Sequence, residues 1–566
     1  MKPQTWRAQY LKTVPWTKEQ LTVFNTVKEC PDNISVEAVA GSGKTTLIFG
    51  LIAALPANAK IKVLAFNKHI ALKLRNDERI PKNRVSVGTC HSTGMGMMIG
   101  NWGGTKPKVD PNKYSRLVKQ QLREIRTYTD LQSRMPVFPR LEPEEIEEFV
   151  ESTADIAEFA HKTLNGTKPE QLEGMARYYG INVPAGNLKD WALKIAGVVI
   201  DQGLKEAIND KIISYGEMLY FPYRMGLLAP KKDYVIVDEY QDLSAAQLRL
   251  VSKFAEQGAK VILLGDNRQS INGFAGADPD AVNRANEKFN TLRLDLSVCF
   301  RCPSWHLDLA RTFNSKIMPA TGAGEGIVSV CHPDLLPDKL VKGDLVISRL
   351  TLPLINCCLE ALKAGLKVGV RGGDLASSLK RLAFKANQPG KNFLVALQEH
   401  VDKEWMKLNQ YENVAEIDKL QGVSNALIFA YQQTRPHSLD ELLKGIEKIF
   451  NLEKPDIEFS TIHRAKGGEA DRVFLLGSNL MPYYNTAQFP WQRKEEDNLT
   501  YVALTRAKHE LVFVPYLMED VDGDIEELME HPYGGLELPK KITRIDAPRA
   551  PKEEVYAQLA LFPGAV

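Results

Sequence analysis

The sequence predicts an α/β protein in which two parallel-sheet domains each carry a mainly helical insertion. Short apolar segments that end in glycine or polar residues alternate with helical patterns, as in doubly wound sheets. Two charged, helical stretches interrupt this alternation. We therefore expect a first domain at 1–92 and 205–295 with an insertion at 93–204, a second domain at 296–373 and 455–516 with a short insertion at 374–454, and an acidic and Pro-containing linker with a tail at 517–566.

A glycine-rich turn within VEAVAGSGKTT (36–46) is the strongest local signal. An apolar strand runs into the turn and a helix-prone stretch follows, which points backbone N–H groups and the positive end of a helix dipole at phosphates. Lys44 is expected to reach the β- and γ-phosphates, and the Thr45 hydroxyl to hold Mg²⁺. The expected phosphate-binding residues are Ala40, Gly41, Ser42, Gly43, Lys44, Thr45 and Thr46.

A second apolar strand, in KDYVIVDEYQDL (232–243), ends in two acids. Its position predicts Asp238 as a ligand of Mg²⁺ and Glu239 as the base that takes a proton from an attacking water. Gln269 follows another buried strand and is placed to sense the γ-phosphate. Together with Lys44, these residues predict hydrolysis of ATP with Mg²⁺ as cofactor.

Other polar and aromatic residues leave alternatives open. The Gln20 amide either completes a helix cap or pairs with adenine, and the Phe274 ring is either core or a stacking platform for a base. His91 alone is most simply a structural histidine. Arg301 and Arg506 offer fixed charges from the second domain, and an arginine supplied to the γ-phosphate is worth roughly 10³–10⁵ in rate.

Composition narrows the class of protein. The chain is 44% hydrophobic and 25% charged, with a net charge of +2, so any nucleic-acid site must be a local groove. The seven cysteines are scattered, and no apolar run approaches membrane-spanning length. These features predict a cytoplasmic protein with no membrane contact. They do not decide between a bacterial and a phage-infected cell, and both remain open.

From residue 20 to about 516 the order of motifs resembles the superfamily 1 DNA helicases of the UvrD/Rep type. The resemblance implies two RecA-like domains with an ATP cleft between them, and ATP-dependent 3′ to 5′ movement on single-stranded DNA, with unwinding at junctions between single and double strands. The segments that carry it are AVAGSGKTT (38–46), LAFNKHIA (64–71), GTCHST (88–93), VDEYQD (237–242), GDNRQSINGFAGAD (265–278), LSVCFRCP (296–303), STIHRAKGGEADRVFLL (460–476) and YVALTRAKHELVF (501–513).

The same resemblance implies roles for single residues. Gln20 contacts adenine, Phe300 stacks near the base, Arg301 and Arg506 act as arginine fingers, and Glu469 joins the nucleotide site. The residues that fall where the family holds single-stranded DNA are Phe66, Asn67, Thr89, His91, Phe274, Thr461 and His463.

The sequence departs from the family pattern at several positions. Asn272 stands where Tyr is usual, Phe274 and Ala275 where Trp and Arg are usual, and Cys299-Phe300 replaces Asn-Tyr. One base-stacking platform is therefore expected to be weaker. The second insertion is also much shorter than the family's regulatory arm.

The tail ends in a short apolar peptide that resembles the sliding-clamp-binding motif of bacterial replication and repair proteins. The alternative is a small packing segment. The residues concerned are Gln558, Leu559, Leu561 and Phe562.

Two other functions remain open on the sequence alone. A translocase on single-stranded DNA can strip bound proteins without processive unwinding. A regulatory ATPase or phosphotransferase shares only the phosphate loop.

Overall fold

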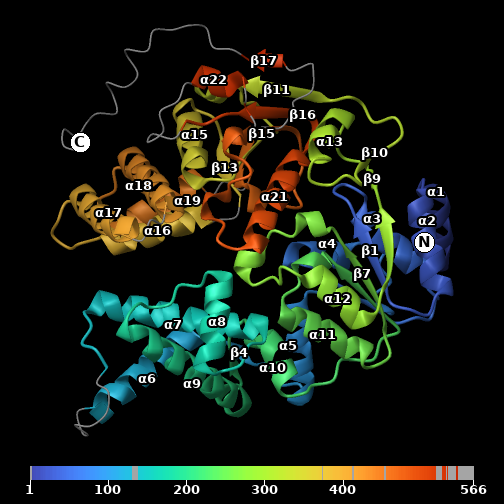
Figure 1. Ribbon diagram of the computed structural model, residues 1–566, viewed down its shortest axis with the longest axis horizontal. Coiled ribbons are helices and arrows are strands. Elements are labelled where there is room, and N and C mark those ends of the chain that lie inside the picture. The colour runs from blue at the N-terminus through green and yellow to red at the C-terminus, as the bar shows by residue number, and fades with distance from the viewer. Residues whose placement is uncertain are drawn as a thin grey trace. The chain divides into compact units, whose positions relative to one another are not determined.

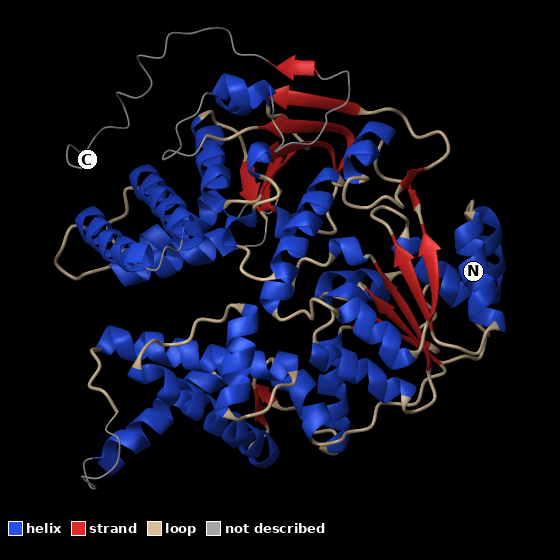
Figure 2. Ribbon diagram, in the orientation of Figure 1, coloured by secondary structure: helices blue, strands red, loops and turns tan. Residues whose placement is uncertain are grey.

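The computed structural model describes residues 3–129, 138–371, 374–410, 414–450, 454–517, 525–530, 532 and 543–545. The chain divides into two compact units, Met1–Cys299 and Phe300–Val566. Each unit is built around its own parallel β-sheet, drawn in red in Figure 2. The predicted fold class, α/β with two parallel-sheet domains, is confirmed.

The first unit contains a six-stranded sheet in the order β3-β2-β6-β7-β1-β8, with every neighbouring pair parallel. Because crossovers place helices on both faces of such a sheet, its strands read as continuous apolar runs. The strands are β1 (Ile34–Ala38), β2 (Ile61–Leu64), β3 (Val85–Gly88), β6 (Tyr234–Asp238), β7 (Lys260–Gly265) and β8 (Leu292–Leu296).

Alternate residues of the central strands enter two separate hydrophobic clusters. Ile236 and Ile262 pack on one face, whereas Val235 and Val261 pack on the other. Both faces of the sheet are therefore covered, and only the strand ends are left for polar chemistry. The helices of this unit outside the insertion are α1 (Pro3–Thr13), α2 (Lys18–Glu29), α3 (Lys44–Ala54), α4 (Lys68–Asn76), α5 (Cys90–Asn101), α10 (Glu217–Arg224), α11 (Ala245–Ala255) and α12 (Ala281–Phe289).

A helical insertion lies between α5 and α10 and has a hydrophobic core of its own (Figure 1). A two-stranded parallel ladder joins its two ends, β4 (Lys108–Val109) with β5 (Ile212–Ile213). The sequence did not single out α8 as a helix. The insertion's helices are α6 (Lys113–Thr129), α7 (Pro143–Thr163), α8 (Pro169–Tyr179) and α9 (Asn187–Asn209).

A buried ion pair connects this insertion to α10. The Lys113 ammonium is fully buried and lies 2.7 Å from Glu217 Oε2, and it also donates to the carbonyl oxygens of Gly203 and Ile212 at 2.8 Å each. The Tyr114 hydroxyl donates to Glu217 Oε1 at 2.9 Å. Because every charge here has a partner, α6, α9 and α10 are held at one point.

The second unit contains a seven-stranded sheet in the order β13-β14-β12-β15-β16-β11-β17, again with all neighbouring pairs parallel. Its strands are β11 (Ile327–Cys331), β12 (Leu345–Ser348), β13 (Val368–Val370), β14 (Ile457–Thr461), β15 (Ala470–Leu476), β16 (Ala507–Val514) and β17 (Thr543–Ile545). The helices outside its insertion are α13 (Ser304–Ala310), α14 (Leu336–Lys339), α15 (Thr351–Lys363), α20 (Ile462–Ala465), α21 (Pro490–Leu504) and α22 (Ile525–Glu530).

The second insertion packs directly on α15. Ile355 and Leu359 of α15 belong to the same hydrophobic cluster as Leu379 and Leu427 of the insertion. Gly422 allows the close approach, since a Cβ there would lie 3.0 Å from Ile355 Cδ1. The insertion's helices are α16 (Asp374–Ala386), α17 (Phe393–Gln410), α18 (Val414–Thr434) and α19 (Leu439–Phe450). Within the described ranges, none of the helices has the length and apolar character needed to cross a membrane.

The buried ion pair gives a test of how the first insertion is held. Lys113→Met leaves the Glu217 carboxylate buried without its cation, so we expect a loss of roughly 3–5 kcal/mol in the unfolding free energy of this part of the chain. Urea denaturation followed by tryptophan fluorescence measures the loss. The control is Lys119→Met, which breaks an exposed pair with Glu147 and should cost at most about 1 kcal/mol. Equal losses in the two variants would contradict the assignment.

Candidate functional site

The glycine-rich turn after β1 has the conformation that its sequence requires. Gly41 (φ 69°) and Gly43 (φ 81°) are left-handed, a region that side chains rarely adopt, and α3 starts directly behind at Lys44. Ser42 Oγ is buried and lacks a hydrogen-bond partner in the described chain. The Ser42 hydroxyl and the N–H groups at the start of α3 are thus available for hydrogen bonds. The oxygen atoms of a phosphate chain could accept these bonds.

Acids from two strand ends surround the Lys44 ammonium. Its Nζ lies 3.4 Å from Glu239 Oε2. Burial opposes the charge, but the carboxylates of Glu239, Asp266 and Asp238 together raise the pKa of Lys44 above its ordinary value. Lys44 is therefore a cation at neutral pH, and the acids stay close to it.

Glu239 is held in a strained and hydrogen-bonded position. Its backbone is left-handed (φ 52°), which is uncommon for a residue with a side chain. Gln241 Nε2 donates to Glu239 Oε2 at 2.6 Å, and Gln241 Oε1 accepts the backbone N–H of Asp266 at 3.1 Å. Asp238, at the end of β6, is 5% exposed. The two predicted acids thus lie beside Lys44 with the base already oriented.

Gln269 lies at the end of the neighbouring strand. It closes a 3₁₀ turn, Asn267–Gln269, directly after β7, and its Nε2 donates to Asp266 Oδ2 at 2.6 Å. Burial raises the pKa of Asp266, although Lys44 acts against this. Through Asp266, Gln269 therefore contacts the group of acids that surrounds Lys44.

The Gln20 side chain completes a helix cap, one of the two roles considered for it, and it also contacts the phosphate loop. Its Oε1 accepts the Thr17 N–H at 3.0 Å, which completes a capping box at the start of α2. Its Nε2 donates to the Ser42 carbonyl at 3.4 Å. The adenine contact stays a prediction.

The second unit brings three of its predicted nucleotide residues into one neighbourhood. Arg301 Nε lies 2.7 Å from Glu469 Oε2, and Arg301 Nη1 donates to the Thr505 carbonyl at 3.2 Å. Lys508 Nζ lies 2.8 Å from Glu469 Oε1. Burial opposes ionisation of Glu469, but Lys508 and Arg301 lower its pKa. Phe300, next to Arg301, is 52% exposed.

Arg506 belongs to this neighbourhood but is fully buried. Its Nε donates to the Val502 carbonyl at 2.8 Å, its Nη1 to the Gly468 carbonyl at 3.1 Å and its Nη2 to Thr505 Oγ1 at 3.0 Å. The guanidinium group is thus held by its own unit. Its role as an arginine finger stays a prediction.

The predicted DNA residues of the first unit follow neighbouring strands β2 and β3. Asn67 caps α4 by accepting the Ile70 N–H at 2.9 Å, and Thr89 caps α5 by accepting the Ser92 N–H at 3.2 Å. Phe66, just before Asn67, is half-buried. The two caps give Asn67 and Thr89 a structural role whether or not they also contact DNA.

His91 and the turn that follows Phe274 lie near a residue that the sequence did not single out. Lys162, near the end of α7, donates to the Ala275 carbonyl at 3.4 Å, and burial together with the Lys162 charge lowers the pKa of His91. Gly276 makes the contact possible, because a Cβ there would lie 3.1 Å from Lys162 Cδ. Phe274 is 57% exposed, so its ring lies outside the core. No local motif marks Lys162, since the contact joins residues far apart in the chain.

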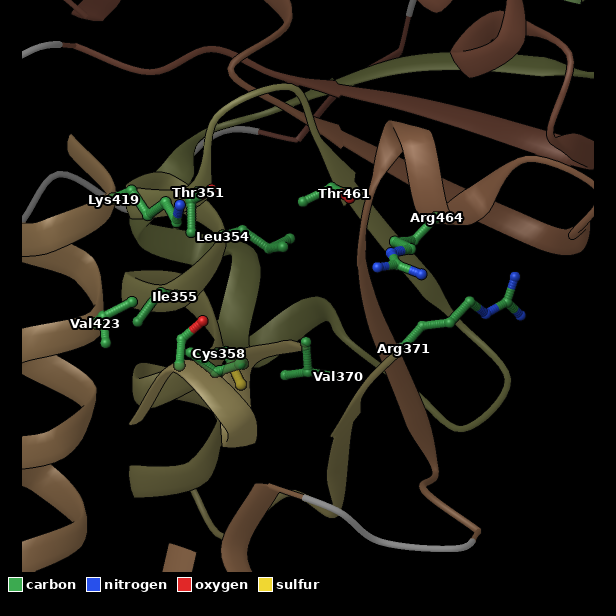
Figure 3. A pocket seen from close by; sticks show the side chains of 12 residues that line it. Thr351, Leu354, Ile355, Cys358, Val370, Arg371, Lys419, Val423, Thr461 and Arg464 are labelled. Atoms are coloured by element: carbon green, nitrogen blue, oxygen red, sulfur yellow. The ribbon is translucent and has the colours of Figure 1, made fainter. Parts of the chain in front are cut away.

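In the second unit, Thr461 ends β14 and His463 lies in α20 directly behind it. Burial, with the charges of Arg349, Lys466 and Arg464, lowers the pKa of His463 to about 3, so its ring is neutral at physiological pH. Thr461 lines a cavity of about 200 Å³ and points toward Leu354, whereas Arg371 extends away (Figure 3). The other lining residues are Thr351, Ile355, Cys358, Val370, Leu375, Ser378, Lys419, Val423 and Arg464.

The clamp-like peptide is a prediction about residues outside the described ranges. It comprises Gln558, Leu559, Leu561 and Phe562.

Comparison with known proteins adds to this geometry. Residues 16–290 match the UvrD/REP helicase N-terminal domain, and residues 373–517 match the UvrD-like helicase C-terminal domain. The chain is 24% identical over 553 residues to F-box DNA helicase protein 1 of Schizosaccharomyces pombe, covering 88% of this chain and 58% of that protein. It is 25% identical over 376 residues to DNA helicase IV of Escherichia coli, covering 62% of this chain and 42% of that one. With ATP-dependent DNA helicase srs2 of S. pombe it shares 28% identity over 176 residues, 30% of this chain and 20% of the relative.

The chain thus spans at most 58% of the length of these relatives. The two matched domains nevertheless cover more than half of the chain, with most of the first unit in one and β14, β15 and β16 of the second unit in the other. The two domains follow one another in the order that the motifs predict. The ion pair of Lys44 with Glu239 lies within the first of them. The chain belongs to the UvrD/REP family of superfamily 1 helicases.

Proposed function

We propose that this protein is an ATP-dependent translocase on single-stranded DNA that unwinds duplexes in the 3′ to 5′ direction, in replication, repair or recombination. The observation that carries the proposal is the grouping of Lys44, Asp238 and Glu239 behind a glycine-rich turn. Family membership supports the choice of ATP and DNA as ligands.

The residues of the first unit divide the work of hydrolysis. Lys44 binds the phosphates as a fixed cation. Glu239, oriented by Gln241, accepts the proton of the attacking water. The phosphate loop lowers the cost of bringing the negatively charged phosphates into a buried site, because it leads into the N-terminus of α3, which favours negative charge.

A magnesium ion fits the donors beside this loop. Mg²⁺ usually takes one or two carboxylates together with substrate phosphates. Thr45 is exposed at the start of α3, and Asp238 ends β6, so these two would hold it. When bound, the ion neutralises charge on the phosphates. Among the described residues, no group of three or more His, Cys, Asp or Glu forms a metal site by itself.

For DNA, the exposed ring of Phe274 and the residues after β2 and β3 support a single-strand site on the first unit. Stacking of a base on an aromatic ring is worth roughly 1–3 kcal/mol. Opening a duplex costs about 1.4 kcal/mol per base-pair step, so stacking alone does not drive unwinding and ATP turnover must. We also propose a sliding clamp as a partner, on the sequence of the tail alone.

ATP turnover tests the proposal directly. We expect hydrolysis that single-stranded DNA stimulates, and a loss of at least about 10²-fold in kcat for Lys44→Ala and for Glu239→Gln, because each removes a charge needed at the phosphates or the water. Turnover that ignores DNA supports the regulatory ATPase or phosphotransferase instead. Full activity of Lys44→Ala would contradict both.

The direction of movement along DNA can be tested separately from ATP turnover. Duplexes with a 3′ single-stranded tail should be unwound with ATP, and those with a 5′ tail should not. A strand-separation assay with fluorescent oligonucleotides measures both. If neither duplex opens but a protein bound ahead on single-stranded DNA is displaced, the protein strips proteins without processive unwinding.

Lys162 gives a quantitative prediction for DNA binding. If it neutralises one phosphate beside Phe274, Lys162→Gln should flatten the plot of log K against log salt by about 0.7 and weaken binding about 5-fold at 0.1 M salt. Lys162→Arg should keep the slope. Lys168→Gln, at an exposed lysine before α8, is the matched control and should leave the slope unchanged. An unchanged slope in Lys162→Gln would exclude a phosphate contact there.

A further inference from the structure

One acid beside the phosphate loop has no role in the function proposed so far. Glu37 lies in β1, a strand paired on both sides, between the buried residues Val36 and Ala38 and in register with Gly265 on β7 and Asp295 on β8. A carboxyl group in the middle of a sheet is costly unless it is hydrogen-bonded. Its presence there therefore calls for a physical reason.

Glu37 makes one short hydrogen bond to the neighbouring strand end. The backbone N–H of Asn267 donates to Glu37 Oε1 at 2.6 Å. Asn267 is the first residue of the 3₁₀ turn that ends at Gln269. On the other side of the turn, Asp266 accepts from Arg268 N–H at 3.0 Å and from Gln269 Nε2 at 2.6 Å. Glu37 thus holds the start of the turn and Asp266 holds its end.

The bond belongs to a longer set of contacts across three strand ends. The N–H of Asp266 donates to Gln241 Oε1, and Gln241 Nε2 donates to Glu239 Oε2. Glu239 lies beside Lys44. Glu37 and Glu239 are therefore at opposite ends of one polar network that runs from β1 through the turn after β7 to the end of β6.

The charged groups around Glu37 make its ionised form costly to the fold. Burial and the neighbouring Asp266 raise the pKa of Glu37 to about 7; Asp295 also raises it, while the Asn267 N–H and Lys44 act in the opposite direction. The Tyr240 hydroxyl also faces this carboxyl, with Arg293 nearby. A carboxyl whose folded pKa lies above its ordinary value of 4.5 loses stabilisation as the pH rises through 7. At pH 8 a neutral side chain would suit the fold better.

We propose that Glu37 is a positioning residue for ATP hydrolysis, whose carboxylate fixes the Asn267–Gln269 turn so that the Gln269 amide is held ready for the terminal phosphate bound at Lys44. The inference rests on the proposed function, since Gln269 matters only if a nucleotide is hydrolysed. An ionised carboxylate accepts a stronger hydrogen bond than a neutral group. The turn is therefore held most firmly when Glu37 is charged.

Two substitutions at Glu37 separate its hydrogen bond from its charge. Glu37→Met keeps the length of the side chain but removes the acceptor, so kcat for DNA-stimulated ATP turnover should fall about 10-fold or more, with KM for ATP changed by less than about 3-fold. Glu37→Gln keeps an acceptor oxygen but not the charge, so its kcat at pH 8 should lie between those of Glu37→Met and the wild type. The matched control is Asp295→Asn, the exposed acid in register on β8, which should leave kcat within about 2-fold of the wild type.

The pH profile supplies a readout that a purely structural role would not move. Wild-type kcat/KM for ATP, which reports the free protein, should rise between about pH 6 and 8 with a midpoint near 7, and this step should be absent in Glu37→Gln. Thermal unfolding should show Glu37→Gln melting higher than the wild type at pH 8, and the gain should shrink at pH 5.

Unchanged kcat in Glu37→Met would overturn the inference. So would a melting temperature of Glu37→Gln below that of the wild type at pH 8, because the residue would then be there for the fold. These outcomes are distinct from failure of the proposed function, in which the wild type itself shows no ATP turnover.

Discussion

The positive charge of Lys44 makes the rest of the candidate site possible. Glu239, Asp238 and Asp266 come from the ends of two adjacent strands and are drawn together around one ammonium group. Without that cation, buried carboxylates so close would repel one another and become protonated. The strand order β6-β7-β1 produces the meeting, because it places the phosphate loop and both acidic strand ends along one edge of the sheet. The strand order thus brings these residues together, and the charge of Lys44 then keeps the acids ionised beside it.

The two units use opposite edges of their sheets for their predicted nucleotide residues. In the first unit these residues follow β1, β6 and β7, at the carboxyl ends of the strands. In the second unit Glu469 directly precedes β15 and Arg506 directly precedes β16. Arg301 joins them through Glu469 and the Thr505 carbonyl. The carboxyl end of β14, where Thr461 lines the cavity, lies at the other edge of the same sheet. The residues predicted to contact the nucleotide and those predicted to contact DNA therefore lie at different edges of this sheet.

Local sequence patterns predicted the fold class well. They could not predict contacts between residues that are far apart in the sequence. The phosphate loop was predictable because Gly41 and Gly43 need left-handed backbone, and the strands because both faces of each are apolar. The bond from Asn267 to Glu37 and the contact of Lys162 with Ala275 join residues that are 230 and 113 positions apart. A single sequence carries no sign of such pairings. The roles given to the individual site residues stay predictions, as do the domain boundaries.

The packing of the second insertion limits how it can move. Ile355 and Leu359 of α15 are part of the insertion's own hydrophobic core, and Gly422 brings α18 against the backbone of α15 at Leu352. Separating the two would expose these side chains, at a cost of roughly 1.5–3 kcal/mol for each large aliphatic group. The first insertion differs in degree, because its core takes in Tyr220 of α10 and otherwise consists of residues of the insertion itself. If the second insertion rotates as a rigid body, α15 must therefore move with it. In the chain, α15 directly follows strand β12 of the sheet. Any such rotation would be transmitted directly to the strand ends where Thr461 lies.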